Sequence, residues 1–123
     1  MQEGYELYKK HLENGSKIMI CVDCDVDGFT SAAVFYCYFM DHLKEKYPNV
    51  EFMYHIPEGK EHGLRSIMNF FTGNKICDLI VLPDSSSNDY EQHAELKSMG
   101  YDILVLDHHD ANKYSDDAIV INN

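Results

Sequence analysis

Side chains that can bind metal ions gather in three short stretches of this sequence. The first stretch holds aspartates at alternate positions, the second a single aspartate, and the third an aspartate followed by two histidines: Asp23, Asp25 and Asp27, then Asp84, then Asp107, His108 and His109. Mixed carboxylate and imidazole ligands suit Mn²⁺ well, Mg²⁺ acceptably, and zinc or iron less specifically. Two such ions, roughly 3.5 to 4 Å apart, would make hydroxide from water and stabilise the attacking and leaving oxygens of a phosphoryl displacement.

The segments between these residues alternate between helical and strand patterns. Apolar residues at helical spacing predict helices over residues 4–14, 30–46, 64–71 and 87–99, the last with Ser87 or Asn88 as its N-cap. Apolar runs predict strands over residues 17–22, 50–56, 77–82, 101–106 and 118–121. The alternation predicts an α/β fold, a doubly wound and mainly parallel sheet of about five strands with helices on both faces.

Each acidic stretch follows a predicted strand. In a parallel sheet these positions share the carboxyl edge, where open α/β folds bind ligands, so we expect the side chains to converge. Two like charges about 4 Å apart would cost on the order of 4 kcal/mol at an effective dielectric of about 20, and a divalent cation removes that conflict. The segment from Gly28 to Ser31 would also direct free backbone N–H groups toward an anion, which suits a phosphate.

Each feature also has a simpler explanation. An aspartate after a strand is often a helix cap or a turn residue, and the pair His108 and His109 could belong to a solvated loop. These explanations do not account for acidic residues in three separate loops. Cys21 and Cys24 form a C-x-x-C pair, but on a strand they would point to opposite faces and could not easily bind one zinc ion.

The remaining cysteines, histidines and aromatic residues are predicted to be structural. We interpret the cysteines as reduced core thiols: Cys21, Cys24, Cys37 and Cys77. We expect the histidines on the predicted helices to be exposed: His11, His42 and His93. We expect an aromatic stripe to pack in the core: Phe35, Tyr36, Tyr38 and Phe39.

The composition indicates one soluble domain. The chain has 123 residues, of which 45% are hydrophobic, which is enough for one core. Since no apolar run approaches the roughly 20 residues of a membrane span, and the first residues are too polar for a secretory signal, we expect a cytoplasmic protein. The net charge of −11 disfavours a pure nucleic-acid-binding module. This negative charge counts less against an enzyme in which bound cations, rather than basic side chains, contact the phosphate.

The motifs resemble those of the DHH phosphoesterase superfamily, and within it the RecJ-like exonucleases. The stretch VDCDVDGFTS at residues 22–31 looks like that family's first motif, and LVLDHH at 104–109 looks like its Asp-His-His motif. Weaker matches are IP at 56–57 with EHGL at 61–64, where His62 replaces the usual Tyr, IVLPDS at 80–85, and AIVIN at 118–122. The pyrophosphatase branch usually places a His before the Asp-x-Asp pair. Asp23 occupies that region here, so the RecJ-like branch fits better.

The resemblance implies roles for the acidic and imidazole side chains. Asp25, Asp27, Asp84 and His108 would be ligands of Mn²⁺ or Mg²⁺, with two ions expected. Asp23, Asp107 and His109 would act beside them, Asp23 and Asp107 as supports or additional ligands and His109 by orienting the site or contacting the scissile phosphate. The substrate would be single-stranded nucleic acid. Residues 1–123 would form the amino-terminal part of a DHH domain, without the family's later acidic motif and carboxyl-terminal substrate-binding domain.

Two other functions remain open. A DHH module without the later motif could be a catalytically silent scaffold. A phospho-accepting receiver domain has a similar size and similarly placed aspartates. It requires a Lys after the fifth strand, however, where this chain has Asn122 and Asn123. It also leaves the two histidines unexplained.

Overall fold

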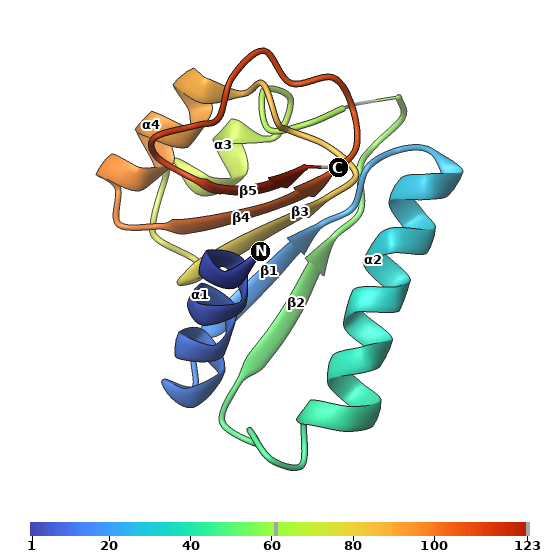
Figure 1. Ribbon diagram of the computed structural model, residues 1–123, viewed down its shortest axis with the longest axis vertical. Coiled ribbons are helices and arrows are strands. Elements are labelled where there is room, and N and C mark those ends of the chain that lie inside the picture. The colour runs from blue at the N-terminus through green and yellow to red at the C-terminus, as the bar shows by residue number, and fades with distance from the viewer. Residues whose placement is uncertain (61, 123) are drawn as a thin grey trace.

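The structure, a computed structural model, describes residues 1–60 and 62–122. Glu61, from the Glu-His-Gly-Leu segment, and Asn123, from the terminal Asn pair, lie outside the described residues. One sheet contains the five predicted strands: β1 Lys17–Cys21, β2 Glu51–His55, β3 Leu79–Pro83, β4 Asp102–Asp107 and β5 Ile119–Asn122. Their order is β2-β1-β3-β4-β5, and every neighbouring pair is parallel (Figure 1).

Helices cover both faces of this sheet, so the predicted fold class is confirmed. Helices α1 (Gln2–Glu13) and α2 (Val26–Tyr38) lie on one face, and α3 (Met68–Phe71) and α4 (Tyr90–Ser98) lie on the other (Figure 1). Because side chains alternate along a strand, Ile18 and Ile20 pack in the first layer with Leu12, while Met19 and Cys21 pack in the second with Leu96. Apolar residues on both faces of β1 therefore explain the two-layer core.

The helix after β1 starts earlier than its sequence pattern predicts. It begins at Val26 rather than Thr30, because Asp25 is extended and its carboxylate accepts a hydrogen bond from the Gly28 N–H at 2.8 Å. The α-helix ends at Tyr38, and a short π-helix, η1 (Phe39–Leu43), follows it. The consequence for the site is that Asp27 lies in the first turn of a helix rather than in a loop.

Two other predicted helices are shorter than expected. Leu64, Ile67 and Phe71 are all buried, as their spacing indicates, but turns carry the first two and only Met68–Phe71 is helical. The fourth helix starts at Tyr90, and neither Ser87 nor Asn88 is its N-cap. The Ser87 N–H instead donates to the Asp107 carboxylate, so residues 84–88 form a loop at the sheet edge.

Several expectations about single residues are wrong. His11 and His93 are buried: both ring nitrogens of His11 find partners, Ser16 and Asp102, whereas among the described residues His93 contacts Ser115 through Nδ1 alone. Cys21 and Cys77 are core thiols, but Cys37 is exposed and Cys24 lies half-buried in the loop after β1.

The aromatic stripe is divided between core and surface: Phe39 is buried, Phe35 and Tyr36 are half-buried, and Tyr38 is exposed. Within the described residues, no helix is both long and apolar enough to cross a membrane.

The strand order creates one position suited to a ligand. The chain leaves β1 toward β2 on one side and continues from β3 toward β4 and β5 on the other. At such a switch point the connections diverge, which opens a crevice between the carboxyl ends of β1 and β3. Asp23 and Asp25 follow β1, and Asp84 follows β3.

Candidate metal centre

Gly28 allows the start of α2 to approach the end of β1. A Cβ atom at this position would lie 2.5 Å from the Asp23 Cβ and 2.6 Å from the Asp23 carbonyl oxygen, both too close for real atoms. Any other residue would push the helix start away from the loop. The Gly therefore keeps Asp23 and Asp25 close together at the mouth of the crevice.

The amide groups at this helix start are already used. The Gly28 N–H donates to the Asp25 carboxylate, and the Phe29 N–H donates to the Asp25 carbonyl at 3.0 Å. The expectation that the segment from Gly28 offers free N–H groups to a phosphate is therefore wrong for these two groups. An aspartate at the N-cap satisfies them first.

Asp84 is the most unusual carboxylate of the site. It is 4% exposed and adopts a left-handed backbone conformation, with φ of 65°. His108 Nε2 lies 2.7 Å from its Oδ1 atom, whereas its buried Oδ2 atom has no hydrogen-bond partner among the described residues. Burial raises the pKa of Asp84, and the nearby Asp25 carboxylate raises it further, against the opposing effect of His108. Such a carboxylate has an open position for a cation.

Asp107 is, by contrast, fully engaged by its surroundings. Its Oδ1 atom accepts hydrogen bonds from the His108 and His109 N–H groups at 2.8 and 3.2 Å and lies 2.6 Å from His109 Nδ1. Its Oδ2 atom accepts from the Ser87 N–H at 3.2 Å. Burial alone would raise the pKa of Asp107, but these hydrogen bonds lower it. The same contact with Asp107 raises the pKa of His109. Asp107 thus shapes the loop and orients His109.

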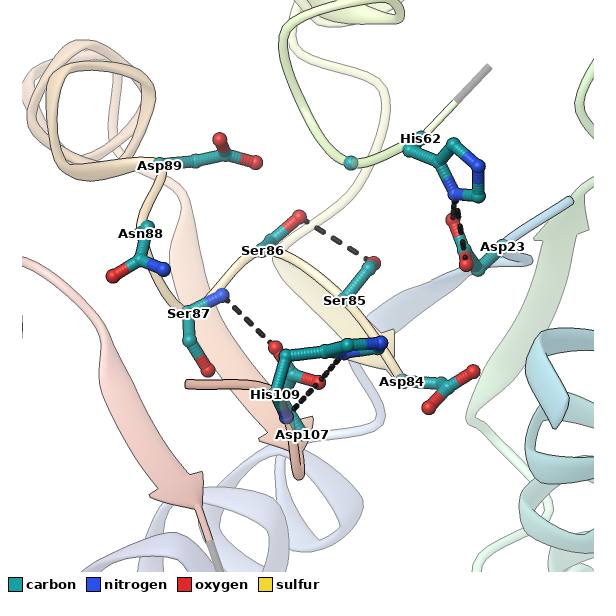
Figure 2. A pocket seen from close by; sticks show the side chains of 11 residues that line it. Asp23, His62, Asp84, Ser85, Ser86, Ser87, Asn88, Asp89, Asp107 and His109 are labelled. Carbon is teal, nitrogen blue, oxygen red and sulfur yellow. Dashed lines mark hydrogen bonds and ion pairs between the residues drawn. The ribbon is translucent and has the colours of Figure 1, made fainter. Parts of the chain in front are cut away.

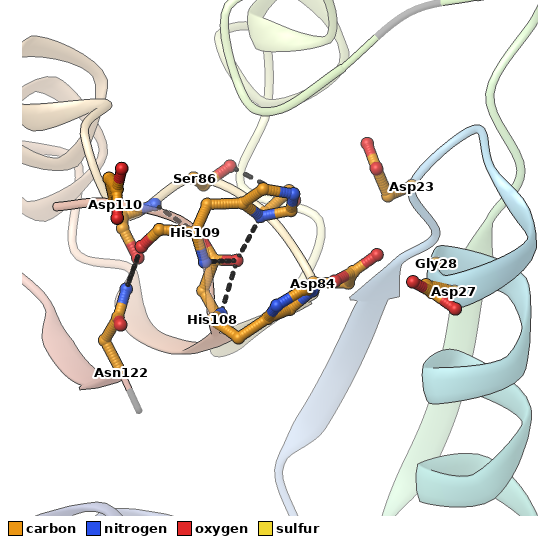
Figure 3. A network of polar contacts seen from close by, with 12 residues as sticks. Asp23, Asp27, Gly28, Asp84, Ser86, His108, His109, Asp110 and Asn122 are labelled. Atoms are coloured by element: carbon orange, nitrogen blue, oxygen red, sulfur yellow. Dashed lines mark hydrogen bonds and ion pairs between the residues drawn. The ribbon is translucent and has the colours of Figure 1, made fainter.

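Two groups of potential ligands meet at Asp84. Asp23, Asp25 and Asp84 offer oxygen atoms within 4.8 Å of one another, and Asp84, His108 and His109 form a second such group. Figure 3 shows the histidines on one side of Asp84 and the Asp23 loop on the other. The convergence expected from the sequence is therefore present. Two adjacent groups that share one carboxylate are an arrangement suited to a pair of ions.

Asp27 is the predicted ligand that joins neither group among the described residues. It is exposed in the first turn of α2, and Ser31 donates to its backbone carbonyl at 2.6 Å. No hydrogen bond within the described part of the chain holds its carboxylate. Figure 3 places Asp27 on the α2 side of the site.

Three residues contribute to the site without having been assigned a functional role from the sequence. Asn122, at the end of β5, donates to the Ser87 hydroxyl and to the His109 carbonyl, both at 2.8 Å. His62 Nδ1 lies 3.1 Å from Asp23 Oδ1. The end-of-strand position of Asn122 was a signal that could have indicated its place, whereas Ser87 and His62 lie in loops whose course the sequence pattern does not predict.

A polar hollow opens beside these groups. It has a volume of about 350 Å³ and is lined by the loop after β3 together with side chains from the other loops: Asp23, His62, Gly63, Asp84, Ser85, Ser86, Ser87, Asn88, Asp89, Asp107 and His109. Figure 2 shows His62 and Asp23 on one side of this hollow and Asp107 with His109 on another. Four of its lining side chains are carboxylates, which favours a cation beside the candidate ligands.

The sequence matches the family model described as the DHH family, N-terminal domain, over residues 17–123. The chain belongs to the DHH family. It is 37% identical over 114 residues to the putative SPbeta prophage-derived single-strand DNA-specific exonuclease YorK of Bacillus subtilis strain 168 and, equally, to the putative single-strand DNA-specific exonuclease yorK of Bacillus phage SPbeta. These matches cover 93% of this DHH chain but 18% of each relative.

Solved structures of RecJ share the fold of this DHH chain. An exonuclease RecJ bound to manganese superimposes with a TM-score of 0.77 and 22% identity over 98% of this chain and 30% of that one. RecJ from Thermus thermophilus in complex with Mn²⁺ gives 0.73 and 21% identity, over 98% and 16%. The predicted membership in the DHH superfamily is confirmed by the family model, and the RecJ structures share the fold of the chain. The chain spans less than a third of any of these proteins.

Proposed function

We propose that this chain is the amino-terminal, metal-binding part of a DHH domain in an exonuclease that hydrolyses phosphodiester bonds of single-stranded DNA with Mn²⁺ or Mg²⁺. The observation that carries the proposal is the buried Asp84 Oδ2 atom, which lacks a hydrogen-bond partner among the described residues, in a side chain that belongs to both groups of potential ligands. Leaving a buried carboxylate oxygen unsatisfied is costly unless a ligand completes it. A divalent cation is the ligand that a group of carboxylates and imidazoles selects.

The donor set fits two cations. Asp25 and Asp84, with Asp23 beside them, would hold one ion, and Asp84 and His108, with His109 nearby, would hold the other. Asp27 is proposed as a further ligand because it lies in the first turn of α2, the helix that Asp25 caps. Its exposed side chain can rotate toward the crevice. When bound, divalent cations supply positive charge that activates water and offsets the charge developing on the phosphate.

The remaining residues position the reacting groups. The Asp107 carboxylate contacts both the imidazole ring and the backbone N–H of His109, so it holds the imidazole in one orientation. His109 keeps its proton to a higher pH because of this contact and can donate a hydrogen bond to a phosphate oxygen. Asp23 supports the ligands from the β1 side. Asn122 ties the end of β5 to the His109 carbonyl and so keeps this loop in place.

The substrate is proposed from the relatives as well as from the site. Both curated relatives are named as single-strand DNA-specific exonucleases, at 37% identity. The net charge of −11 gives this chain little attraction of its own for DNA. We therefore propose that a later acidic motif and a carboxyl-terminal substrate-binding domain, for which the greater length of the relatives leaves room, complete the enzyme and hold the strand.

The test is Mn²⁺-dependent release of nucleotides from a labelled single strand by the intact protein. We expect Asp84→Ala and His108→Ala to lower the rate at least about 100-fold, because each removes a group that holds cation charge at the phosphate. Asp41→Ala, which removes an aspartate from η1 away from the crevice, is the matched control and should keep the rate. Full activity in both site variants would overturn the assignment of the site.

Membership in the DHH family leaves the receiver-domain alternative without support. The silent-scaffold alternative is decided by the same assay. A protein that binds Mn²⁺ but releases no nucleotide from any single strand would be a scaffold, and the hydrolase proposal would fail.

A further inference from the structure

A second cluster of potential ligands lies beside the candidate metal centre and differs from it in chemistry. Asp23, Cys24 and His62 offer an oxygen, a sulfur and a nitrogen atom, all within 4.8 Å of one another. His62 Nδ1 lies 3.1 and 3.2 Å from the two Asp23 carboxylate oxygens and 3.4 Å from the Cys24 Sγ atom, and the same sulfur lies 3.1 Å from His62 Nε2. One nitrogen atom therefore sits close to both other donors.

These separations are near those of a zinc site. With Zn–S of about 2.3 Å and Zn–N and Zn–O of about 2.0 to 2.2 Å, a tetrahedral ion holds its sulfur and nitrogen ligands about 3.5 Å apart and its nitrogen and oxygen ligands about 3.4 Å apart. The distances from His62 Nδ1 differ from these values by only a few tenths of an ångström. A rotation of the exposed His62 ring that turns Nδ1 toward the sulfur, with the buried Asp23 carboxylate in place, would complete the geometry.

The position of His62 is fixed by its neighbours in the chain. The Leu64 N–H donates to Asp89 Oδ2 at 2.9 Å, and Gly63 adopts a left-handed conformation, with φ of 69°, against the same carboxylate. This anchor attaches the segment to the loop before α4 and leaves the His62 ring over the rim of the crevice (Figure 2). The His62 side chain is 61% exposed, so solvent can reach the cluster and supply a fourth ligand.

We propose that Asp23, Cys24 and His62 form a binding site for Zn²⁺ that adjoins the oxygen-rich centre at Asp25 and Asp84 and shares Asp23 with it. A thiolate and an imidazole select zinc over Mn²⁺ or Mg²⁺, which prefer carboxylate and water. One thiolate and one carboxylate also balance the charge of the ion. The cysteine pairs with His62 rather than with Cys21, which is buried in the core and turned away.

Asp23 belongs to both the zinc cluster and the group with Asp25 and Asp84. Zinc bound at the cluster would hold this carboxylate and place positive charge beside the crevice. It follows that zinc should inhibit hydrolysis when Mn²⁺ is present, and that Cys24→Ser should weaken the inhibition relative to the activity of that variant without zinc. This consequence rests on the proposed function, whereas zinc binding itself does not.

The binding test uses Co²⁺ as a spectroscopic substitute for zinc, added to the intact protein. We expect the thiolate-to-cobalt absorption band in the near ultraviolet, which Zn²⁺ abolishes and excess Mg²⁺ leaves unchanged. Cys24→Ser should remove the band and weaken zinc binding at least about tenfold, since even indirect contacts to a metal ligand are worth that much. Cys37→Ser, at an exposed position on α2, should keep it. A missing band in the unaltered protein, or an unchanged band in Cys24→Ser, would overturn the proposal.

A second measurement needs no substitution. Zn²⁺ should slow the alkylation of Cys24 at least about tenfold, read peptide by peptide by mass spectrometry, because metal ligation blocks the sulfur. Cys37 in the same molecule serves as the internal control and should react at the same rate with and without zinc. Equal slowing at both cysteines, or at neither, would contradict the site. Both measurements report on zinc even if the intact protein hydrolyses no DNA.

Discussion

The two edges of the sheet each hold an aspartate beside a histidine, but the pairs differ in what surrounds them: Asp84 is buried and Asp102 is half-buried. At the carboxyl edge His108 lies 2.7 Å from Asp84. At the amino edge His11 lies 2.7 Å from Asp102. Lys97 and Lys10 also contact Asp102, at 2.6 and 3.5 Å, whereas Asp84 has another carboxylate, Asp25, as its neighbour.

The pKa values of the two aspartates follow from these surroundings. Although burial alone would raise it, hydrogen bonds from Lys97 and His11 lower the pKa of Asp102 to about 2. Burial and Asp25 raise the pKa of Asp84. A carboxylate that the protein itself neutralises stabilises the fold, whereas a buried carboxylate left with a negative neighbour is suited to an external cation. The same pair of residue types thus has a structural role at one edge and a functional one at the other.

The largest effect that separates the edges should come from Asp84→Asn. We expect the nuclease rate of the intact protein to fall at least about 100-fold, because the amide no longer supplies charge to hold a cation. The unfolding temperature measured with EDTA should stay the same or rise, since the substitution removes a charge that burial disfavours. Loss of activity together with marked destabilisation would place Asp84 with Asp102 as a structural residue and remove the contrast.

Gly28→Ala tests whether close approach, rather than charge alone, assembles the carboxyl edge. The added Cβ would lie 2.5 Å from the Asp23 Cβ and 2.6 Å from its carbonyl oxygen, so the helix start must shift. We expect a loss of about 1 to 3 kcal/mol in the free energy of unfolding and weaker Mn²⁺ binding in calorimetric titration. Gly73→Ala, where the Cβ would have no neighbour within 4 Å, is the matched control. Equal Mn²⁺ affinity in the two variants would contradict this role.

The sequence predicted the sheet and the meeting of the acidic loops, but not the details that distinguish the edges. Long apolar strands and their alternation with helices are strong signals, so β1 to β5 and both helical layers were correctly predicted. The first residue of a helix depends on which local side chain caps it. Asp25 caps α2, so this helix begins at Val26 rather than at the expected Thr30. His11 was expected on the surface because its charged partner is remote: Asp102 is 91 positions away. Contacts of that kind leave no periodic pattern.

Asp102→Asn is the counterpart at the amino edge. We expect the free energy of unfolding at pH 7 to fall by about 1 to 2 kcal/mol, an amount reduced by solvent screening of the exposed lysines. Since the pKa of Asp102 is lowered from 3.8 to about 2 in the folded state, this stabilisation is present above pH 4 and is lost as the pH falls toward 2.

Denaturant titrations at pH 7 and near pH 2, with EDTA present, measure the stability difference between Asp102→Asn and the unaltered protein. That difference should shrink in acid. Nuclease activity at pH 7 should remain, because Asp102 lies at the edge opposite the crevice. A difference that stayed constant with pH would show that the pair contributes no charge-dependent stability.

The smallest effect should come from Asn122→Ala, which tests whether the carboxyl edge also contains structural contacts. Asn122 Nδ2 donates to the Ser87 hydroxyl and the His109 carbonyl, at 2.8 Å each; the first contact is partly buried and the second is exposed. Each such bond contributes about 0.5 to 1.5 kcal/mol when buried, so we expect a total loss near 1 kcal/mol in the free energy of unfolding. Mn²⁺ affinity should change little, because Asn122 contacts neither Asp84 nor Asp25. A loss of Mn²⁺ affinity comparable to that of Asp84→Asn would mean that the β5 loop, and not Asp84 alone, creates the cation site.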